Sequence, residues 1–183
     1  MRKVILYIAM SLDGYIADQN GNVDWLNEYD SDEDVEGTDS YSLFLDKVDT
    51  VIIGYNTYHQ IVTQLSPEQW VYKGLKSYVI THNKILSNSE IVFVNNSPSD
   101  LIKNLKKESG KDIWICGGAN IIKQLMQEDL IDRYYISVIP IILGNGIKLF
   151  DEIDNEIKLD LVQTTRSDNG IVELVYEHRS NGR

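Results

Sequence analysis

The chain has 183 residues, of which 43% are hydrophobic and 25% charged; this excludes a disordered or collagen-like chain, and the length predicts a single domain over residues 1–183. Its formal net charge of −11 argues against nucleic acid or a membrane surface as a partner, because both require a basic surface. The acidic excess is concentrated in residues 1–46, which hold eleven acidic and two basic side chains.

Five short apolar runs, rich in Val, Ile and aromatic residues, predict strands buried on both faces. They are residues 4–10, 50–53, 77–81, 91–94 and 112–116. The first run follows Arg2 and Lys3 as in a signal peptide, but no small-residue cleavage site comes after it. We therefore interpret it as the first strand of a cytoplasmic protein.

Helical spacing of apolar residues predicts helices over residues 39–47, 98–109 and 120–128. In the last third of the chain, the pattern predicts longer strands over residues 133–140, 158–166 and 171–179, with no helix between them. Asn169-Gly170 predicts a hairpin turn. The predicted fold class is α/β, with a mostly parallel central sheet flanked by helices and an antiparallel C-terminal hairpin.

Two predicted strand-to-helix junctions carry glycine. In the segment IWICGGANII (residues 113–122), Gly117 and Gly118 precede an amphipathic helix. Bare backbone beside a helix N-terminus suits a pyrophosphate, and a tight turn without a ligand is the alternative. In VIIGYNTY (residues 51–58), Gly54 ends a strand and Thr57 is a candidate cap and phosphate ligand. Both junctions would face one crevice at the carboxyl ends of parallel strands.

Metal and nucleophile chemistry are not indicated. The histidines His59, His82 and His178 lack metal-ligand spacing, and the single cysteine, Cys116, ends an apparently buried strand. One cysteine cannot form an intrachain disulfide, which also favours the cytoplasm. His82 follows a predicted strand in THNK (residues 81–84), where an anion-recognition loop competes with a solvated turn. The solvated turn is slightly favoured.

Taken together, these segments resemble the dihydrofolate reductase superfamily, and more closely stand-alone proteins similar to the reductase domain of bacterial riboflavin biosynthesis enzymes. Four stretches carry the resemblance, and their order and spacing make it specific. They are IAMSLDGYIA (residues 8–17), VIIGYNTY (51–58), CGGA (116–119), and LID (130–132) with IPIILGNGIKLF (139–150).

The resemblance implies a nicotinamide cofactor, NADPH with NADH not excluded, a small heterocyclic substrate and a homodimer. It implies that the pyrophosphate lies on the two glycine junctions, that Ala9 and Ile16 line the nicotinamide pocket, and that Thr81 and His82 lie near the adenosine ribose. The implied cofactor-binding residues are Ala9, Ile16, Gly54, Thr57, Thr81, His82, Gly117, Gly118, Asn120 and Ile121.

Three departures from the family pattern bear on the chemistry. Tyr55 replaces the arginine that pairs with the 2′-phosphate of NADPH, and a tyrosine cannot make that charged, bidentate contact. The proton donor has no clear counterpart: Asp30, Thr38 and Asp39 are candidates, and Asp39 is preferred. Tyr15 stands where riboflavin-pathway reductases carry a basic residue. A true dihydrofolate reductase and a nucleotide-binding module without catalysis remain the alternatives.

Overall fold

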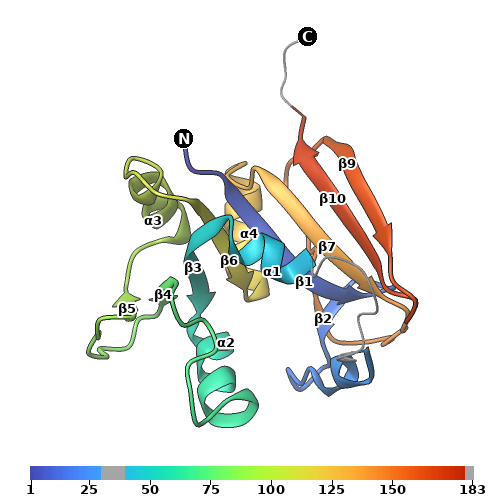
Figure 1. Cartoon of the computed structure of the whole chain (residues 1–183), viewed down its shortest axis with the longest axis horizontal. Coiled ribbons are helices and arrows are strands. Elements are labelled where there is room, and N and C mark those ends of the chain that lie inside the picture. The colour runs from blue at the N-terminus through green and yellow to red at the C-terminus, as the bar shows by residue number, and fades with distance from the viewer. Residues whose placement is uncertain (30–39, 180–183) are drawn as a thin grey trace.

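A computed structural model describes residues 1–29 and 40–179. Its core is an eight-stranded sheet in the order β5-β4-β3-β6-β1-β7-β10-β9 (Figure 1). Neighbouring strands from β5 through β7 pair in parallel, whereas β10 runs antiparallel to both β7 and β9. The strands are β1 (Val4–Ser11), β3 (Val48–Gly54), β4 (Lys76–Ile80), β5 (Ile91–Val94), β6 (Asp112–Gly117), β7 (Arg133–Ile139), β9 (Leu159–Arg166) and β10 (Val172–His178).

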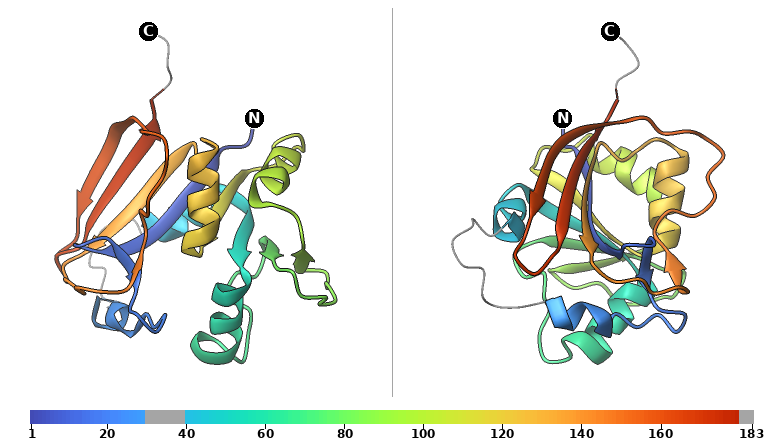
Figure 2. Two further views of the ribbon diagram at one scale, coloured as in Figure 1. Left: turned by 180° about the vertical axis from the view of Figure 1, so that it is seen from behind. Right: turned by 90° about the vertical axis from the view of Figure 1, so that its right-hand side faces the viewer.

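Helices lie on both faces of this sheet. α3 (Pro98–Leu105) and α4 (Ala119–Gln127) cover one face, and α1 (Ser40–Leu45) lies on the other (Figures 1 and 2). α2 (Tyr55–Gln60) continues into a π-helical turn (Ile61–Leu65) and projects beyond the strand ends. None of the helices in the described ranges is long and apolar enough to cross a membrane.

The two faces are packed with different side chains. On the α3 and α4 face, aliphatic residues such as Ile52, Ile115 and Ile122 are fully buried. On the α1 face the packing is aromatic: the rings of Tyr7 and Phe44 stack with centroids 4.4 Å apart, and Phe44 meets the edge of Trp114 at 5.4 Å. Burial of β-branched and aromatic side chains on both faces explains why these apolar runs form strands.

The predicted sheet, its helices and the C-terminal hairpin are confirmed. Ser97 caps α3 by accepting a hydrogen bond from Asp100 N at 3.1 Å, and Gly170 closes the hairpin turn with φ +89°. One prediction is wrong: Thr57 does not cap α2, because the helix already begins at Tyr55, with Gly54 as its N-cap and no side-chain cap bond.

The sequence reading missed three small elements. They are a 3₁₀ helix (Asp24–Tyr29) and a two-stranded ribbon of β2 (Tyr15–Ala17) and β8 (Ile147–Lys148). Each is too short to show a periodic hydrophobic pattern. Together they flank one end of the sheet, next to the end of β1 (Figures 1 and 2).

Candidate active site at the carboxyl ends of the strands

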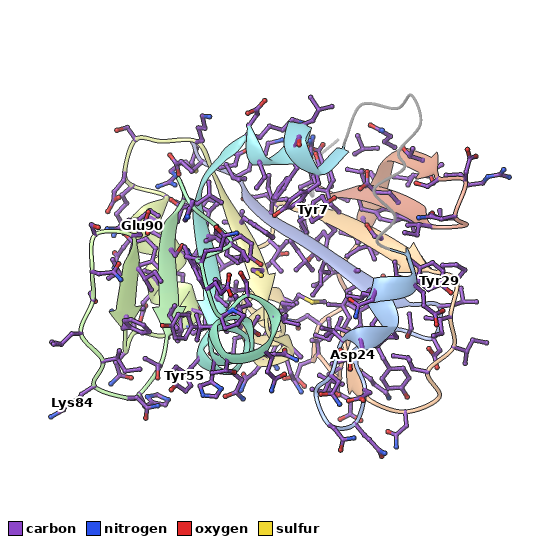
Figure 3. The ribbon with its side chains drawn as sticks, turned by 60° about the horizontal axis from the view of Figure 1, so that its bottom comes forward. Tyr7, Asp24, Tyr29, Tyr55, Lys84 and Glu90 are labelled. Atoms are coloured by element: carbon purple, nitrogen blue, oxygen red, sulfur yellow. The ribbon has the colours of Figure 1, made fainter. Side chains whose placement is uncertain are left out.

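The parallel strands of the sheet all end at the same edge, which is turned toward the viewer in Figure 3. On one side of this edge, Tyr55 marks the start of α2; on the other, Asp24 and Tyr29 mark the 3₁₀ helix. Open α/β sheets bind ligands outside the carboxyl ends of their strands. The two glycine junctions lie here.

The structure brings the two junctions into direct contact, because β3 and β6 are neighbours and Ile53 pairs with Gly117. A Cβ atom on Gly54 would lie 3.3 Å from Gly118 N and 3.3 Å from the Cδ1 of Ile121. A Cβ on Gly118 would lie 3.4 Å from Thr57 Oγ1. Backbone thus approaches backbone at a distance that only glycine at position 54 accommodates without displacing a neighbour.

Gly117 and Gly118 present bare backbone beside the start of α4. Gly117 has φ +130°, its peptide bond to Gly118 is cis, and no atom lies within 4 Å of the position a Cβ would take. The Gly118 carbonyl accepts from Ile121 N (3.0 Å) and Ile122 N (3.2 Å). The N–H groups of Ala119 and Asn120 precede these bonds and have no intrahelical acceptor, so they are available to an anion at the start of the helix.

The β4 side of the edge carries Thr81 and His82. The Thr81 N–H donates to Val94 O at 2.9 Å, and the buried Thr81 hydroxyl accepts from Asn83 N at 3.0 Å. His82 is exposed, and its Nδ1 lies 2.6 Å from Asn95 Oδ1. Because β3 lies between β4 and β6, these two residues are separated from Gly117 by the end of one strand.

The β1 side carries Ala9 and Ile16. Ala9 pairs with Ser137 of β7, and Ile16 packs against the aliphatic core from β2. Two contacts hold the surrounding loops in place: Leu149 N donates to Gly14 O at 2.9 Å, and the Gln60 side chain donates from α2 to Gly21 O at 2.9 Å. The second contact joins the two sides of the edge.

Asp13 fixes the turn after β1 and is not placed to donate a proton. Its carboxylate accepts from the Ser11 hydroxyl and from the backbone N–H groups of Leu143 (3.1 Å) and Gly144 (2.7 Å). The Ser11 hydroxyl, helped by these amides, lowers the pKa of Asp13 below its ordinary value. An aspartate held ionised in this way is an anchor rather than an acid catalyst.

The preferred proton donor, Asp39, and its alternatives Asp30 and Thr38 lie outside the described residues. A different group at this edge escaped the sequence reading. The indole Nε1 of Trp25 is buried and has no hydrogen-bond partner within the described ranges. No sequence pattern signals such a donor, because its isolation depends on how the 3₁₀ helix packs.

Cys116 immediately precedes Gly117 but is not a nucleophile. Its Sγ lies 3.2 Å from the hydroxyl of Tyr72, and burial raises the pKa of the thiol to about 11. Among the residues that the structure describes, no three His, Cys, Asp or Glu side chains are grouped to hold a metal ion.

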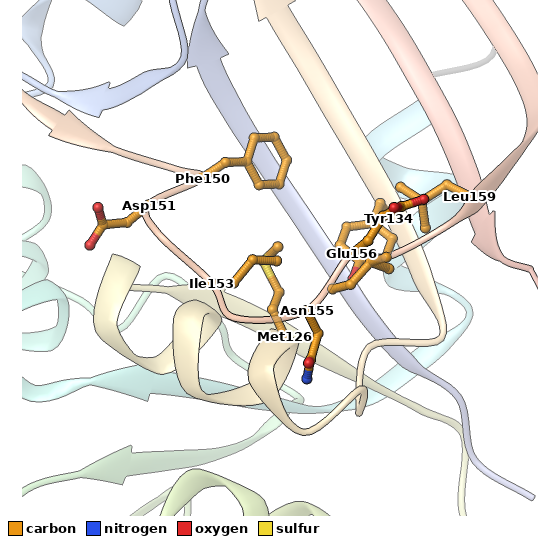
Figure 4. Close-up of a pocket in the computed structure, with 9 residues that line it drawn as sticks. Met126, Tyr134, Phe150, Asp151, Ile153, Asn155, Glu156 and Leu159 are labelled. Atoms are coloured by element: carbon orange, nitrogen blue, oxygen red, sulfur yellow. The ribbon is translucent and has the colours of Figure 1, made fainter.

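Two cavities lie away from this edge. One, of about 290 Å³, is apolar and lies between α4 and the segment that follows β8 (Figure 4). It is lined by Met126, Tyr134, Phe150, Asp151, Ile153, Asn155, Glu156, Ile157 and Leu159. A second, of about 240 Å³, lies at the opposite edge of the sheet beside Lys3 and His178. Neither of these two cavities includes a predicted site residue.

Sequence comparison relates this chain to known proteins. The RibD C-terminal domain family matches residues 2–173. "Uncharacterized protein YwjB" of Bacillus subtilis (strain 168) is 42% identical, with 96% of this chain and 97% of YwjB covered. Riboflavin biosynthesis protein RibD of Haemophilus influenzae is 25% identical over 85% of this chain, which spans 52% of the length of RibD.

Solved structures give the same assignment. A protein of Shewanella sp. PV-4, provisionally assigned to riboflavin biosynthesis, has a TM-score of 0.83 and 26% identity, covering 97% of this chain and 99% of its own. Acinetobacter baumannii RibD has a TM-score of 0.66 at 19% identity, covering 98% of this chain and 58% of its own. The fold is dihydrofolate-reductase-like, as expected. By sequence and by architecture, this chain belongs to the RibD C-terminal domain family.

Proposed function

We propose that the protein is a reductase that transfers a hydride from NADPH or NADH to a small heterocyclic substrate. The observation that carries the proposal is the contact between the two glycine junctions, where Gly54 abuts Gly118 and Thr57 lies beside it. Membership of a reductase-domain family supports the same reaction class.

The residues present fit a dinucleotide. The space beside Gly117 would be filled by any side chain, and the start of α4 supplies N–H groups and a partial positive charge for a pyrophosphate. We assign the pyrophosphate to Gly117, Gly118, Asn120 and Ile121, with the Thr57 hydroxyl opposite. When bound, the cofactor supplies the hydride, and the protein supplies orientation and exclusion of water.

The rest of the edge would position the two ends of the cofactor. In our assignment Ala9 and Ile16 line the nicotinamide side, where the Asp13 anchor holds the surrounding turn. Thr81 and His82 lie on the adenosine side. A proton reaches the substrate from Asp39 or from water.

The substrate is proposed to be neutral or cationic. Asp13, Asp18, Asp24 and Glu28 lie in the loops and the 3₁₀ helix next to the end of β1, and their like charge would oppose a phosphorylated or polyanionic substrate. We further propose a cytoplasmic homodimer that has neither nucleic acid nor a membrane as a partner. Light scattering after size-exclusion chromatography tests the dimer.

The decisive experiment separates binding from turnover. NADPH and NADH are titrated into the protein by calorimetry, and the same cofactors are then assayed with dihydrofolate and with aminouracil substrates that do or do not carry a phosphate. Micromolar binding with turnover of an unphosphorylated heterocycle is expected. Fast turnover of dihydrofolate would favour a true dihydrofolate reductase, binding without any turnover would favour a nucleotide-binding module, and absence of binding would refute the proposal.

Gly118→Ala gives the sharpest variant. Its φ of −82° is open to any residue, and the added Cβ meets only the Thr57 hydroxyl at 3.4 Å, so the fold should be retained. Cofactor affinity should fall about tenfold, because the methyl group occupies backbone surface assigned to the pyrophosphate. Gly117 is less informative, since φ +130° penalises a side chain whether or not a ligand binds.

A further inference from the structure

Three strand ends meet on the adenosine side of the proposed site. Gly54 pairs with Ile80, and Ile80 pairs with Val94, so β3, β4 and β5 end in register. The chain leaves each strand at the same edge. Tyr55 and Asn95 directly follow β3 and β5, and His82 is the second residue after β4.

The contact with Asn95 leaves the other ring nitrogen of His82, Nε2, as a hydrogen-bond acceptor. Its Nδ1 lies 2.6 Å from Asn95 Oδ1, and an amide oxygen can only accept, so Nδ1 carries the hydrogen. In the tautomer with its hydrogen on Nδ1, the Nε2 atom holds a lone pair. His82 is exposed, and within residues 1–29 and 40–179 its Nε2 has no hydrogen-bond partner. The ring therefore offers an acceptor to a hydroxyl group.

No fixed cation accompanies this acceptor. Tyr55 occupies the first position of α2, with its ring centroid 6.1 Å from that of Tyr58 and 5.9 Å from that of His59. Residues 55–60 and 93–97 contain neither lysine nor arginine, and in residues 81–90 the basic side chain is Lys84. Lys84 is exposed and projects outward from the tip of its loop (Figure 3).

We propose that this edge selects NADH over NADPH. The 2′-hydroxyl of the adenosine ribose donates to His82 Nε2, whereas a 2′-phosphate finds neither a guanidinium nor a positioned ammonium. A phosphate monoester carries a charge of about −1.5 to −2 at pH 7 and needs charge-assisted donors for tight binding. The net charge of −11 adds long-range repulsion. This inference rests on the proposed function, because it requires a dinucleotide on the glycine junctions.

The test is a calorimetric titration of the intact chain with NADH and with NADPH, repeated on two variants. Tyr55→Arg supplies the missing guanidinium at the start of α2. Asn56→Arg is the matched control, because it adds the same charge to the same helix at an exposed, neighbouring position. The measured quantity is the ratio of the two dissociation constants, which does not depend on turnover.

The wild-type protein should bind NADH at least as tightly as NADPH. Tyr55→Arg should shift the ratio toward NADPH by tenfold or more, and Asn56→Arg by less than threefold. A wild-type preference for NADPH of threefold or more would overturn the inference, as would equal shifts in both variants. If neither cofactor binds, the proposed function itself has failed, which is a different result.

Discussion

The two ends of the parallel strands are built in different ways. At the amino ends, charged side chains join the strands: Arg2 donates to Lys111 O at 2.6 Å and to the Asp49 carboxylate, and Lys106 pairs with Asp132 at 2.9 Å. At the carboxyl ends, glycine backbone meets glycine backbone. Side chains therefore fasten one end, while the other leaves N–H groups available to a ligand. Changes at the two ends should alter different properties.

The largest effect should come from the amino end. Arg2→Ala removes a side chain that is 5% exposed and also donates to the Thr50 hydroxyl at 2.6 Å. Its loss leaves buried acceptors unpaired and should lower the free energy of unfolding by about 2 kcal/mol, since Asp49 is partly solvated. Urea denaturation measures the change, and cofactor affinity should stay within twofold.

The matched control is Arg179→Ala, which breaks an ion pair with Asp160 in which both side chains are more than half exposed. Such pairs contribute less than about 1 kcal/mol. Equal losses in the two variants would show that the Arg2 network does not fasten the amino ends in particular.

At the carboxyl end, Thr57→Val should weaken cofactor binding and leave stability nearly unchanged. The change removes a hydroxyl but keeps the shape of the side chain, so stability should hardly change. Loss of one hydrogen bond to a phosphate should weaken cofactor binding by roughly three- to tenfold. Thr63→Val serves as its control, because the exposed Thr63 donates to His59 O on the same helical segment. If both variants bind the cofactor like the wild type, Thr57 is not a ligand.

The reactivity of Cys116 reports how accessible the chain is to solvent directly before Gly117. Burial raises the pKa of its thiol to about 11, so at pH 8 very little reactive thiolate forms. Alkylation by iodoacetamide should be slow in the native protein and rapid in guanidinium chloride, as followed by mass spectrometry. Rapid native labelling would mean that the site is open to solvent behind Gly117.

The smallest expected effect is the contribution of Asp13 to stability, which should depend on pH. The pKa of Asp13 is lowered from 3.8 in the folded chain, so its stabilisation is present at neutral pH and is lost as the pH falls through the folded value, below about pH 4. Asp13→Asn should therefore lower the melting temperature slightly at pH 7 and have a smaller effect near pH 3. A difference that persists undiminished at pH 3 would assign the effect to packing.

The central sheet was predictable because strands buried on both faces leave unbroken apolar runs in the sequence. The helix cap at Ser97 and the hairpin turn at Gly170 were also predictable from residue type. The contact between Gly54 and Gly118 was not predictable, because it requires β3 and β6 to be neighbours although two strands (β4 and β5) and two α-helices (α2 and α3) lie between them in the chain. The 3₁₀ helix that contains Trp25 was also not predictable, because an element this short shows no periodic pattern of apolar residues.

The raised pKa of the Cys116 thiol has a practical consequence. If Cys116 is labelled slowly in the native protein, as expected, new cysteines serve as unique attachment points for spectroscopic labels. One label on the loop that contains Gly21 and another on α2 would span the Gln60 bridge, which measures 2.9 Å from Nε2 to the Gly21 oxygen. The distance between the loop and α2 can then be recorded in solution, with and without added NADH or NADPH.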